Sequence, residues 1–391
     1  MTIRIVVVPG PGLDGAQCSE WGKEIGVDVD VRPADAAAVV GAMASGHPSM
    51  AAHPGNGAGP PTPAGVVIAP GRDGFDASGL AAAVAAAAVP VVAVDEGNLR
   101  KAGLEPESTR IAAAGARVLY GRGPGTARYA LLHLACRHGQ AVDTLAYGPD
   151  PNQDGDLWCP SGPGPHPVAV LFHGGFWYHA WERDLMDGLA RDLARRGIAA
   201  WNVEYRRVGA GGGWPATGED AARATDHLLA LAPVYGLDLD RVAVLGHSAG
   251  AQLALWVAAR GRRGEVHPAL AVGMATIADL EEAIAARTGG NSVARLLAAS
   301  PGSDGDDGDL DVALAEASPR ARVPIGVPQL LAHATNDDIV PPTQTTAYAE
   351  AARAAGDDVT VLAIDGGGHF SLIDPLSSAW AAVARAVEAR L

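Results

Sequence analysis

Cysteine is scarce in this sequence: the 391 residues contain only three, Cys18, Cys136 and Cys159. They lie far apart, their number is odd, and no two of them form a Cys-x-x-Cys pair. These features exclude a disulfide framework as the basis of the fold and argue against a zinc site built on thiolates. Since free thiols are typical of reducing compartments, we predict a cytoplasmic location.

The sequence also lacks a long hydrophobic run and an excess of basic residues. The longest apolar stretch, residues 80–94, contains Pro90 and is shorter than the roughly 18 residues that suggest a membrane span. The apolar run Ile5–Val8 is too short for the core of a signal peptide. With 29 Lys and Arg against 44 Asp and Glu, the formal net charge is −15, which repels phosphate backbones and anionic lipids. We therefore expect a small molecule as the partner, and neither nucleic acid nor a membrane.

What the chain does contain is a repeated alternation of short Val/Ile-rich runs with Ala-rich stretches, which is typical of parallel sheets covered by helices. The strand candidates are residues 3–8, 27–31, 66–69, 91–94 and 116–120, and then 168–172, 199–205, 242–245, 270–274, 329–332 and 359–364. The first five predict a flavodoxin-like domain with a five-stranded parallel sheet over residues 1–138. A segment rich in turn formers, 139–167, is expected to hold a linker and leading strands, and 168–391 a larger α/β domain. Residues 47–63 have no periodicity and predict a surface insertion.

A serine in a Gly-rich turn follows the predicted strand 242–245. The sequence Gly246-His247-Ser248-Ala249-Gly250 precedes a helical stretch and fits G-x-S-x-G. Small residues on both sides of the serine let the chain turn sharply and leave the hydroxyl exposed at the head of a helix. With 50 glycines in the chain the pattern is weak by itself, so a tight turn without a catalytic role stays open unless partner residues exist.

Two later strands end in suitable partners for this serine. A serine hydroxyl becomes a nucleophile when a base takes its proton and a third group orients that base. Asp337 follows the predicted strand 329–332, and His369 follows 359–364. Open α/β sheets gather their sites at such carboxyl ends of strands. Asp338 competes for the acid role; we favour Asp337 because it comes first after the strand, and expect Asp338 to cap the next helix.

The residues after strand 168–172, His-Gly-Gly-Phe-Trp, predict an oxyanion hole. Paired glycines allow backbone N–H groups to point at a developing oxyanion, and the residue after the nucleophile completes such a site. The predicted donors are the backbone groups of Gly174, Gly175, Phe176 and Ala249. The candidates for lining the substrate pocket are Trp177, Tyr178, Trp214, His247 and Phe370. Residues 277–311 lie where we expect a helical lid, with the acidic residues 304–311 as a solvated loop.

From about residue 143 to 391 the chain resembles an α/β-hydrolase of the esterase and kynurenine formamidase (arylformamidase) type. The resemblance rests on HGGFW (173–177), VEYRR (203–207) with GGGWP (211–215), GHSAGAQL (246–253) and GHFSLIDP (368–375). It implies Ser248 as nucleophile with His369 and Asp337 as partners, and the backbone of Gly175, Phe176 and Ala249 as oxyanion donors. It further implies a serine hydrolase without metal or cofactor, which cleaves a small ester or aryl formamide through an acyl-enzyme.

Residues 1–138 resemble a type II 3-dehydroquinate dehydratase in the segments 10–13, 68–71, 95–99 and 121–129. The reactive groups of that family are absent: Trp21 and Ala16 stand in place of its tyrosine and arginine, Arg100 in place of its histidine, and Gly12 and Ala69 in place of its asparagines. Enolate formation and protonation of a leaving hydroxyl need such groups, so we predict an inactive domain. The resemblance also implies a homo-oligomer assembled through this domain.

Other functions stay open at this stage. The triad could serve acyl transfer, both halves could be binding or scaffold modules with an unused triad, or the first half could act as a lyase. Residues 10–15 also fit the G-x-G-x-x-G of dinucleotide sites, although Pro11 in the turn argues against it. The acidic residues 304–311 lack the glycine and glutamate of an EF-hand loop. We therefore expect no cofactor and no metal.

Overall fold

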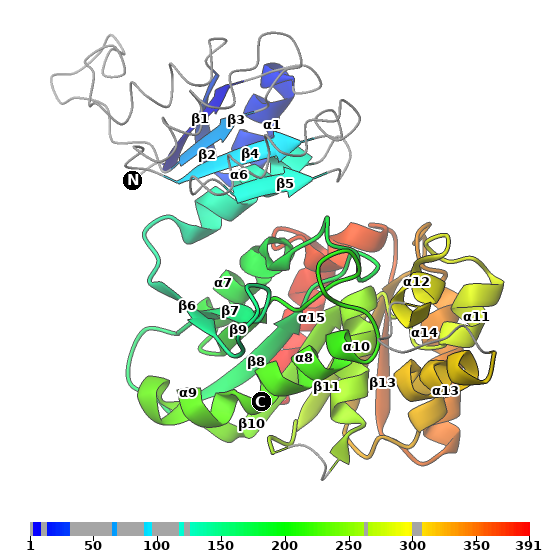
Figure 1. The fold of residues 1–391 in the computed structure, drawn as a ribbon. Helices are drawn as coiled ribbons and strands as arrows, with labels where there is room; N and C mark the ends of the chain where they lie inside the picture. The colour runs from blue at the N-terminus through cyan, green and yellow to red at the C-terminus, as the bar shows by residue number, and fades with distance from the viewer. Residues whose placement is uncertain are drawn as a thin grey trace, which may run out of the picture. The chain divides into compact units, whose positions relative to one another are not determined.

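The chain divides into two compact units, Met1–Gln140 and Ala141–Leu391, each with a sheet of its own (Figure 1). A computed structural model describes residues 3–8, 14–31, 65–68, 90–95, 117–120, 126–261, 265–298 and 307–391. Several positions that the sequence singled out lie outside the described residues: the 47–63 segment, Gly12, Ala69 and Arg100.

The first unit contains a five-stranded parallel sheet in the order β2-β1-β3-β4-β5. Its strands are β1 (Ile3–Val8), β2 (Val27–Val31), β3 (Gly65–Ile68), β4 (Val91–Asp95) and β5 (Arg117–Tyr120). Two helices, α1 (Gly15–Ile25) and α6 (Thr126–Arg137), pack against each other and against the sheet. The buried core between them includes Ile5, Val67 and Leu131, and Trp21 of α1 packs against it.

The second unit is built on an eight-stranded sheet in the order β13-β12-β11-β10-β8-β9-β7-β6. The strands are β6 (Val142–Ala146), β7 (Asp154–Trp158), β8 (His166–Phe172), β9 (Ala199–Val203), β10 (Leu237–His247), β11 (Leu270–Met274), β12 (Gln329–Ala334) and β13 (Val359–Ile364). From β13 to β9 all neighbours are parallel, whereas β7 and β6 are antiparallel at one edge. The carboxyl ends of β8, β10, β12 and β13 therefore meet at one edge of the sheet.

Helices cover both faces of this sheet. The described helices of this unit are α7 (Asp187–Arg195), α8 (Ala216–Asp226), α9 (Leu228–Tyr235), α10 (Ala249–Ala258), α11 (Leu280–Ala285), α12 (Ser292–Ala298), α13 (Asp307–Ala317), α14 (Pro342–Ala354) and α15 (Ser378–Glu388), with short 3₁₀ turns η3 (Arg183–Met186), η5 (Pro319–Arg322) and η6 (His369–Ile373). Figure 1 shows α8 and α10 in front of the sheet and α15 behind it. On the rear face, the Trp380 indole of α15 donates to the Asp192 carboxylate of α7 at 2.8 Å.

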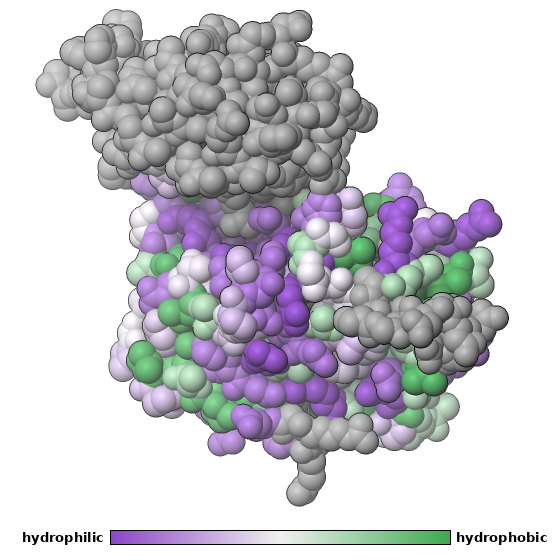
Figure 2. Space-filling view, viewed as in Figure 1, coloured by the Kyte–Doolittle hydropathy of each residue, from purple (hydrophilic) through white to green (hydrophobic). Residues whose placement is uncertain are grey.

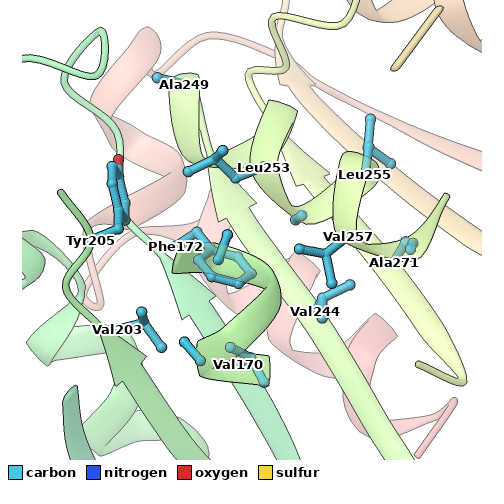
Figure 3. Close-up of a cluster of buried hydrophobic side chains, with 14 of the residues drawn as sticks. Val170, Phe172, Val203, Tyr205, Val244, Ala249, Leu253, Leu255, Val257 and Ala271 are labelled. Carbon is cyan, nitrogen blue, oxygen red and sulfur yellow. The ribbon is translucent and has the colours of Figure 1, made fainter. Parts of the chain in front are cut away.

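The core beneath α10 fixes the position of that helix. Figure 3 shows Val170, Phe172 and Val244 of the central strands lying beside Leu253 and Val257 of α10. All five side chains are buried. Removing an aliphatic or aromatic side chain of this size from water stabilises a fold by about 2 kcal/mol. The helix that begins directly after Ser248 is therefore held firmly against the sheet.

The segment between β11 and β12 carries α11, α12 and α13, and residues 299–306 of it lie outside the described part. It is bonded to the rest of the unit, because Trp214 N–H donates to the Leu296 carbonyl at 2.8 Å and Gln252 Nε2 to the Ala317 carbonyl at 2.8 Å. The helix α13 begins at Asp307, inside the acidic stretch that we expected to be a loop. That expectation was wrong for residues 307–311, while a mobile lid over 277–311 stays a prediction.

Polar side chains cover most of the visible surface of the second unit in Figure 2, with apolar residues in scattered patches. The exposed large apolar residues of this unit include Leu229, Val234, Ile284, Leu310 and Val312. Within the described ranges, no helix is both long and apolar enough to cross a membrane.

Candidate active site

Ser248 lies on a strained turn between β10 and α10. Its φ of 54° and ψ of −118° are unusual for a residue with a side chain, and such strain concentrates at functional sites. The flanking glycines allow this turn: a Cβ on Gly246 would lie 2.0 Å from the Gly250 carbonyl oxygen, and one on Gly250 would lie 2.1 Å from the Phe172 oxygen. The Ser248 N–H donates to the Met274 carbonyl at 2.7 Å, which ties the turn to β11.

We expect Gly250→Ala to lower the free energy of unfolding by about 1–3 kcal/mol or more, because the new methyl group must push α10 away from the backbone of β8. Urea denaturation measures the effect. Gly197→Ala is the matched control: a Cβ there meets nothing within 4 Å, and only its φ of +87° opposes the change, at a cost of about 1–2 kcal/mol. Equal losses in the two variants would contradict the packing argument.

Asp337 and His369 are brought together from two loops. His369 Nδ1 donates to Asp337 Oδ2 at 2.7 Å, and Asp337 Oδ1 accepts from the N–H groups of Ile339 and Val340 at 2.9 Å each. Asp338 is exposed and does not cap a helix, because α14 begins after Pro341 without a side-chain cap. The expected capping role of Asp338 was therefore wrong.

A second histidine, which the sequence reasoning missed, also contacts this carboxylate. His333 Nε2 lies 3.2 Å from Asp337 Oδ2 and 3.0 Å from the Val340 carbonyl oxygen, while His333 Nδ1 lies 2.7 Å from Thr345 Oγ1. Burial alone would raise the pKa of Asp337, but the hydrogen bonds from His333 and His369 outweigh burial and hold that pKa well below its ordinary value. The carboxylate is thus ionised and receives donors at both oxygens. The only signal in the sequence was the position of His333 near the end of a strand, four residues before Asp337.

His247 links the serine turn to the His369 loop. Its Nε2 donates to the His369 carbonyl at 3.1 Å, and the two rings lie 4.5 Å apart between centroids. Burial, together with the nearby charge of His369, lowers the pKa of His247 well below 6.5. His247 is 1% exposed and bridges the serine turn and the His369 loop, and its role in lining the substrate pocket stays a prediction.

The Ser248 hydroxyl makes no hydrogen bond to His369 in the part of the chain that the structure describes. Catalytic hydrogen bonds are often long or poorly aligned without substrate and tighten when it binds. Ser248 is the next residue after His247, and the His247 ring contacts the His369 ring directly. The serine and the His369 imidazole therefore belong to one cluster of neighbouring residues.

The loop after β8 lies against the serine turn. A Cβ on Gly174 would lie 3.1 Å from Ser248 Cβ, and Gly175, Phe176 and Trp177 have positive φ values of 112°, 52° and 56°. Among the described residues, the N–H groups of Gly175, Phe176 and Ala249 donate to no protein acceptor. Three N–H groups beside one serine are a geometry suited to binding an oxyanion.

The aromatic pocket candidates fall into two groups. Trp177 and Trp214 are buried core residues: Trp177 Nε1 donates to Gln252 at 3.0 Å, and Trp214 packs edge-on against Trp256 at 5.1 Å. Both side chains pack in the core, and their part in lining the substrate pocket stays a prediction. Tyr178 is partly buried and packs against His179 at 4.3 Å.

Phe370, by contrast, is 37% exposed, and its ring contacts both His369 and Trp181. Its ring meets His369 edge-on at 5.2 Å and stacks with Trp181 at 6.1 Å. Trp181 packs on the oxyanion loop, since a Cβ on Gly175 would lie 2.3 Å from its side chain. The sequence pointed to Trp181 as a residue that influences the choice of substrate only through its closeness to the Gly-Gly loop.

No group of three or more His, Cys, Asp or Glu side chains in the described ranges could hold a metal ion. The described residues around Ser248 instead supply a hydroxyl, an imidazole–carboxylate pair and backbone N–H groups. These are the groups that nucleophilic acyl transfer uses.

A mixed sheet covered by helices on both faces, with a serine turn at the carboxyl end of a central strand, defines the second unit as an α/β-hydrolase. The family model described as BD-FAE, an esterase-like α/β-hydrolase domain, matches residues 156–351, half of the chain. The chain therefore belongs to the BD-FAE family. This match contains Ser248 and Asp337 and ends before His369.

Solved esterase structures resemble this chain over about two thirds of its length. A bacterial heroin esterase is 25% identical with a TM-score of 0.55, over 65% of this chain and 85% of that chain. Esterase B of Lactobacillus rhamnosis is 21% identical with a TM-score of 0.55, over 68% of this chain and 93% of that one. A bifunctional GH43-CE protein of Bacteroides eggerthii is 20% identical with a TM-score of 0.53 over 64% of this chain, which spans 35% of that longer chain. The last two likenesses concern the fold alone. No curated protein sequence matches this chain.

Proposed function

We propose that the second unit is a serine carboxylesterase for small esters, with Ser248 as nucleophile, His369 as base and Asp337 as the group that orients His369. The observation that carries the proposal is the 2.7 Å bond between His369 Nδ1 and Asp337 beside a strained serine turn. The esterase-like family and the esterase neighbours support hydrolysis of an ester bond.

The reaction proceeds in two halves. His369 Nε2 takes the Ser248 proton while Oγ attacks the ester carbonyl, and the N–H groups of Gly175, Phe176 and Ala249 bind the resulting oxyanion. His369 then gives the proton to the leaving alcohol as the C–O bond breaks, which leaves an acyl-enzyme. Water, deprotonated by His369, attacks the acyl carbon and releases the acid and the Ser248 hydroxyl. Asp337 stays ionised and stabilises the imidazolium in both halves.

Two measurements test this proposal. We expect turnover of p-nitrophenyl acetate and butyrate, and covalent labelling of Ser248 by a fluorophosphonate, which reacts with activated serines. Labelling without turnover would support Ser248 as an activated nucleophile and would exclude these two esters as substrates. Absence of both turnover and labelling would overturn the proposal in favour of a scaffold role.

The exposed face of Phe370 favours substrates with an aromatic ring in the leaving group. The leaving group must approach His369, which protonates it, and Phe370 is the next residue, with Trp181 stacked beside it. An aromatic ring packed against such a pair gains about 0.5–1.5 kcal/mol beyond its buried area. An aryl formamide, with an aromatic amine as leaving group, is the second candidate substrate, and turnover of formanilide against benzyl acetate decides between them.

We expect Phe370→Ala to lower kcat/KM for benzyl acetate by about 10-fold while ethyl acetate changes less than about 3-fold, because a lost aromatic contact of about 1.4 kcal/mol is a factor of ten. Both substrates release alcohols of similar acidity, so their ratio measures binding of the ring. Leu376→Ala, an exposed apolar residue after η6, is the control and should leave the ratio unchanged. Equal losses for both esters would rule out a site for the ring.

The first unit is proposed to be a flavodoxin-like, dehydroquinase-like domain without dehydratase activity, through which the chain forms a homo-oligomer in the cytoplasm. Its strand order of β2-β1-β3-β4-β5 is the order of flavodoxin-like sheets. Trp21, which replaces the family's tyrosine, packs against the core and offers no proton donor of the kind a tyrosine supplies. The full-length Ser248→Ala variant should not turn over 3-dehydroquinate, and light scattering should show an oligomer. Dehydratase turnover would contradict the proposed inactivity of the first unit. A monomer would contradict the proposed assembly.

A further inference from the structure

The loop that holds the candidate oxyanion donors is fastened to one buried carboxylate. Glu204, directly after β9, lies within the second unit's interior, 3% exposed. Its Oε1 is 2.9 Å from His173 Nε2, at the start of the loop, and its Oε2 accepts from the N–H of Arg183, at the end of the loop, at 3.0 Å. Arg207 lies 3.3 Å from the same Oε1 and donates to the Trp181 carbonyl at 2.5 Å. One carboxylate therefore holds both ends of residues 173–183.

Both ring nitrogens of His173 face hydrogen-bond acceptors. Nε2 meets the Glu204 carboxylate, and Nδ1 meets the Gly174 carbonyl oxygen at 2.7 Å. A carboxylate and a carbonyl can only accept, whereas a neutral imidazole donates from one nitrogen alone. His173 satisfies both contacts only as an imidazolium. The Tyr205 ring, stacked on it at 4.4 Å and 12°, and the Tyr205 hydroxyl bonded to the His173 carbonyl at 2.7 Å, fix its orientation.

The charges around His173 accommodate a cation. Four carboxylates, those of Asp154, Asp156, Glu182 and Glu204, are ion-paired with two guanidiniums, those of Arg183 and Arg207. If His173 is an imidazolium, the cluster has three positive charges against its four negative ones, so the added cation brings the cluster closer to neutrality. Although burial alone would raise the pKa of Glu204, Arg207, His173 and Arg183 lower that pKa to about 2. On the side of the serine turn, the neighbouring group is His247, which is neutral.

The Gly174 carbonyl shares its peptide group with the Gly175 N–H. Hydrogen bonds in a chain polarise one another, so a donor on a carbonyl oxygen strengthens the N–H of the same peptide as a donor. A charged donor does so more strongly than a neutral one, because charge-assisted bonds are about twice as strong.

We propose that Glu204 holds His173 as an imidazolium, and that this cation fixes and polarises the Gly174–Gly175 peptide so that the Gly175 N–H binds the oxyanion more strongly. His173 and Glu204 are thus positioning residues that act through a backbone donor, at a strained loop that would otherwise relax. This inference rests on the proposed esterase function only in assigning Gly175 to the oxyanion.

The protonation state is measured directly in the resting full-length enzyme. In protein labelled with ¹⁵N-histidine, both ring nitrogens of His173 should show a one-bond coupling to a proton at pH 7.5, with the signal assigned by its loss in His173→Phe. A ring nitrogen without a proton would overturn the inference. This measurement needs no substrate, so it stands even if the esterase proposal fails.

Kinetics test the consequence for the reaction. We expect Glu204→Gln to lower kcat by about 10- to 100-fold with KM within about 3-fold, which is less than the loss of a complete oxyanion donor. The affinity for a trifluoromethyl ketone, which forms an oxyanion on Ser248, should fall by the same factor as kcat, a change that a loss of folded protein alone cannot produce. If Glu204→Gln does not fold, His173→Phe, which keeps the ring stacked on Tyr205, provides the same test.

Asp226→Asn is the matched control, because it neutralises a partly buried carboxylate paired with Arg260 at 2.8 Å in a different part of the second unit. Its kcat and ketone affinity should match those of the wild type. Unchanged kcat and ketone affinity in Glu204→Gln, or equal losses in Asp226→Asn, would overturn the inference. A wild type that neither turns over esters nor labels at Ser248 would instead overturn the esterase proposal, which separates the two failures.

Discussion

Replacing Ser248 by alanine is expected to lower kcat for a small ester by a factor of about 10⁴ or more, because no other group can form the acyl-enzyme. The proposed oxyanion donors Gly175, Phe176 and Ala249 remain in this variant and should retain some rate over water. Alanine keeps the Cβ of serine, and the bond from the backbone N–H of residue 248 to Met274 does not involve the side chain. The fold should therefore persist. The measurement is single-turnover and steady-state hydrolysis of p-nitrophenyl acetate.

The unfolding midpoint of Ser248→Ala should match the wild type within a few degrees, and fluorophosphonate labelling should disappear. A Ser371→Ala variant is the control, since Ser371 lies in η6 and its hydroxyl donates to the Gly368 carbonyl at 2.8 Å without contact to Ser248. Turnover that survives in Ser248→Ala would show that another group carries the reaction, and a water-mediated mechanism would replace the acyl-enzyme.

The parallel strands of the second unit could be placed from their sequence, whereas the leading strands expected within residues 139–167 could not be given bounds. The strand β11 is buried along its whole length, so LAVGM is a continuous apolar run with clear ends, and its predicted bounds of 270–274 match. The two antiparallel strands β6 and β7 have the sequences VDTLA and DGDLW, in which aspartates and a glycine conceal the strand. For the same reason β10 begins at Leu237, before the predicted residue 242: its first residues include Asp238 and Asp240.

The site shows the same division between local and long-range information. Residue types and their order after strands pointed to Ser248, Asp337 and His369, which the fold brings to one edge of the sheet. The contact between Glu204 and His173 joins residues 31 positions apart, and no local pattern encodes it. For Trp177 and Trp214, closeness in sequence to a site loop does not tell which way the side chain points. Burial in the core decides that, and it depends on packing of distant segments.

Asp337→Asn is expected to lower kcat by about 10⁴-fold, through the tautomer of His369. Asp337 Oδ1 accepts from two backbone N–H groups, so the amide oxygen of asparagine must occupy that position. The NH₂ group then takes the place of Oδ2 and donates to His369 Nδ1. With Nδ1 accepting, the proton of the neutral ring lies on Nε2, and His369 cannot take the proton of Ser248. Steady-state hydrolysis of p-nitrophenyl acetate measures the loss.

Asp338→Asn is the matched control, because it makes the same chemical change at an exposed neighbouring residue, and its kcat should stay within about 2-fold of the wild type. The two variants should also differ in acid stability. The folded-state pKa of Asp337 lies well below 3.8, so its charge stabilises the fold above that pH and the contribution is lost as the pH falls. Asp337→Asn should flatten the pH dependence of unfolding in that range. A collapse of kcat in Asp338→Asn with activity retained in Asp337→Asn would reverse the assignment of the acid, and would require His369 to turn away from the carboxylate that it contacts at 2.7 Å.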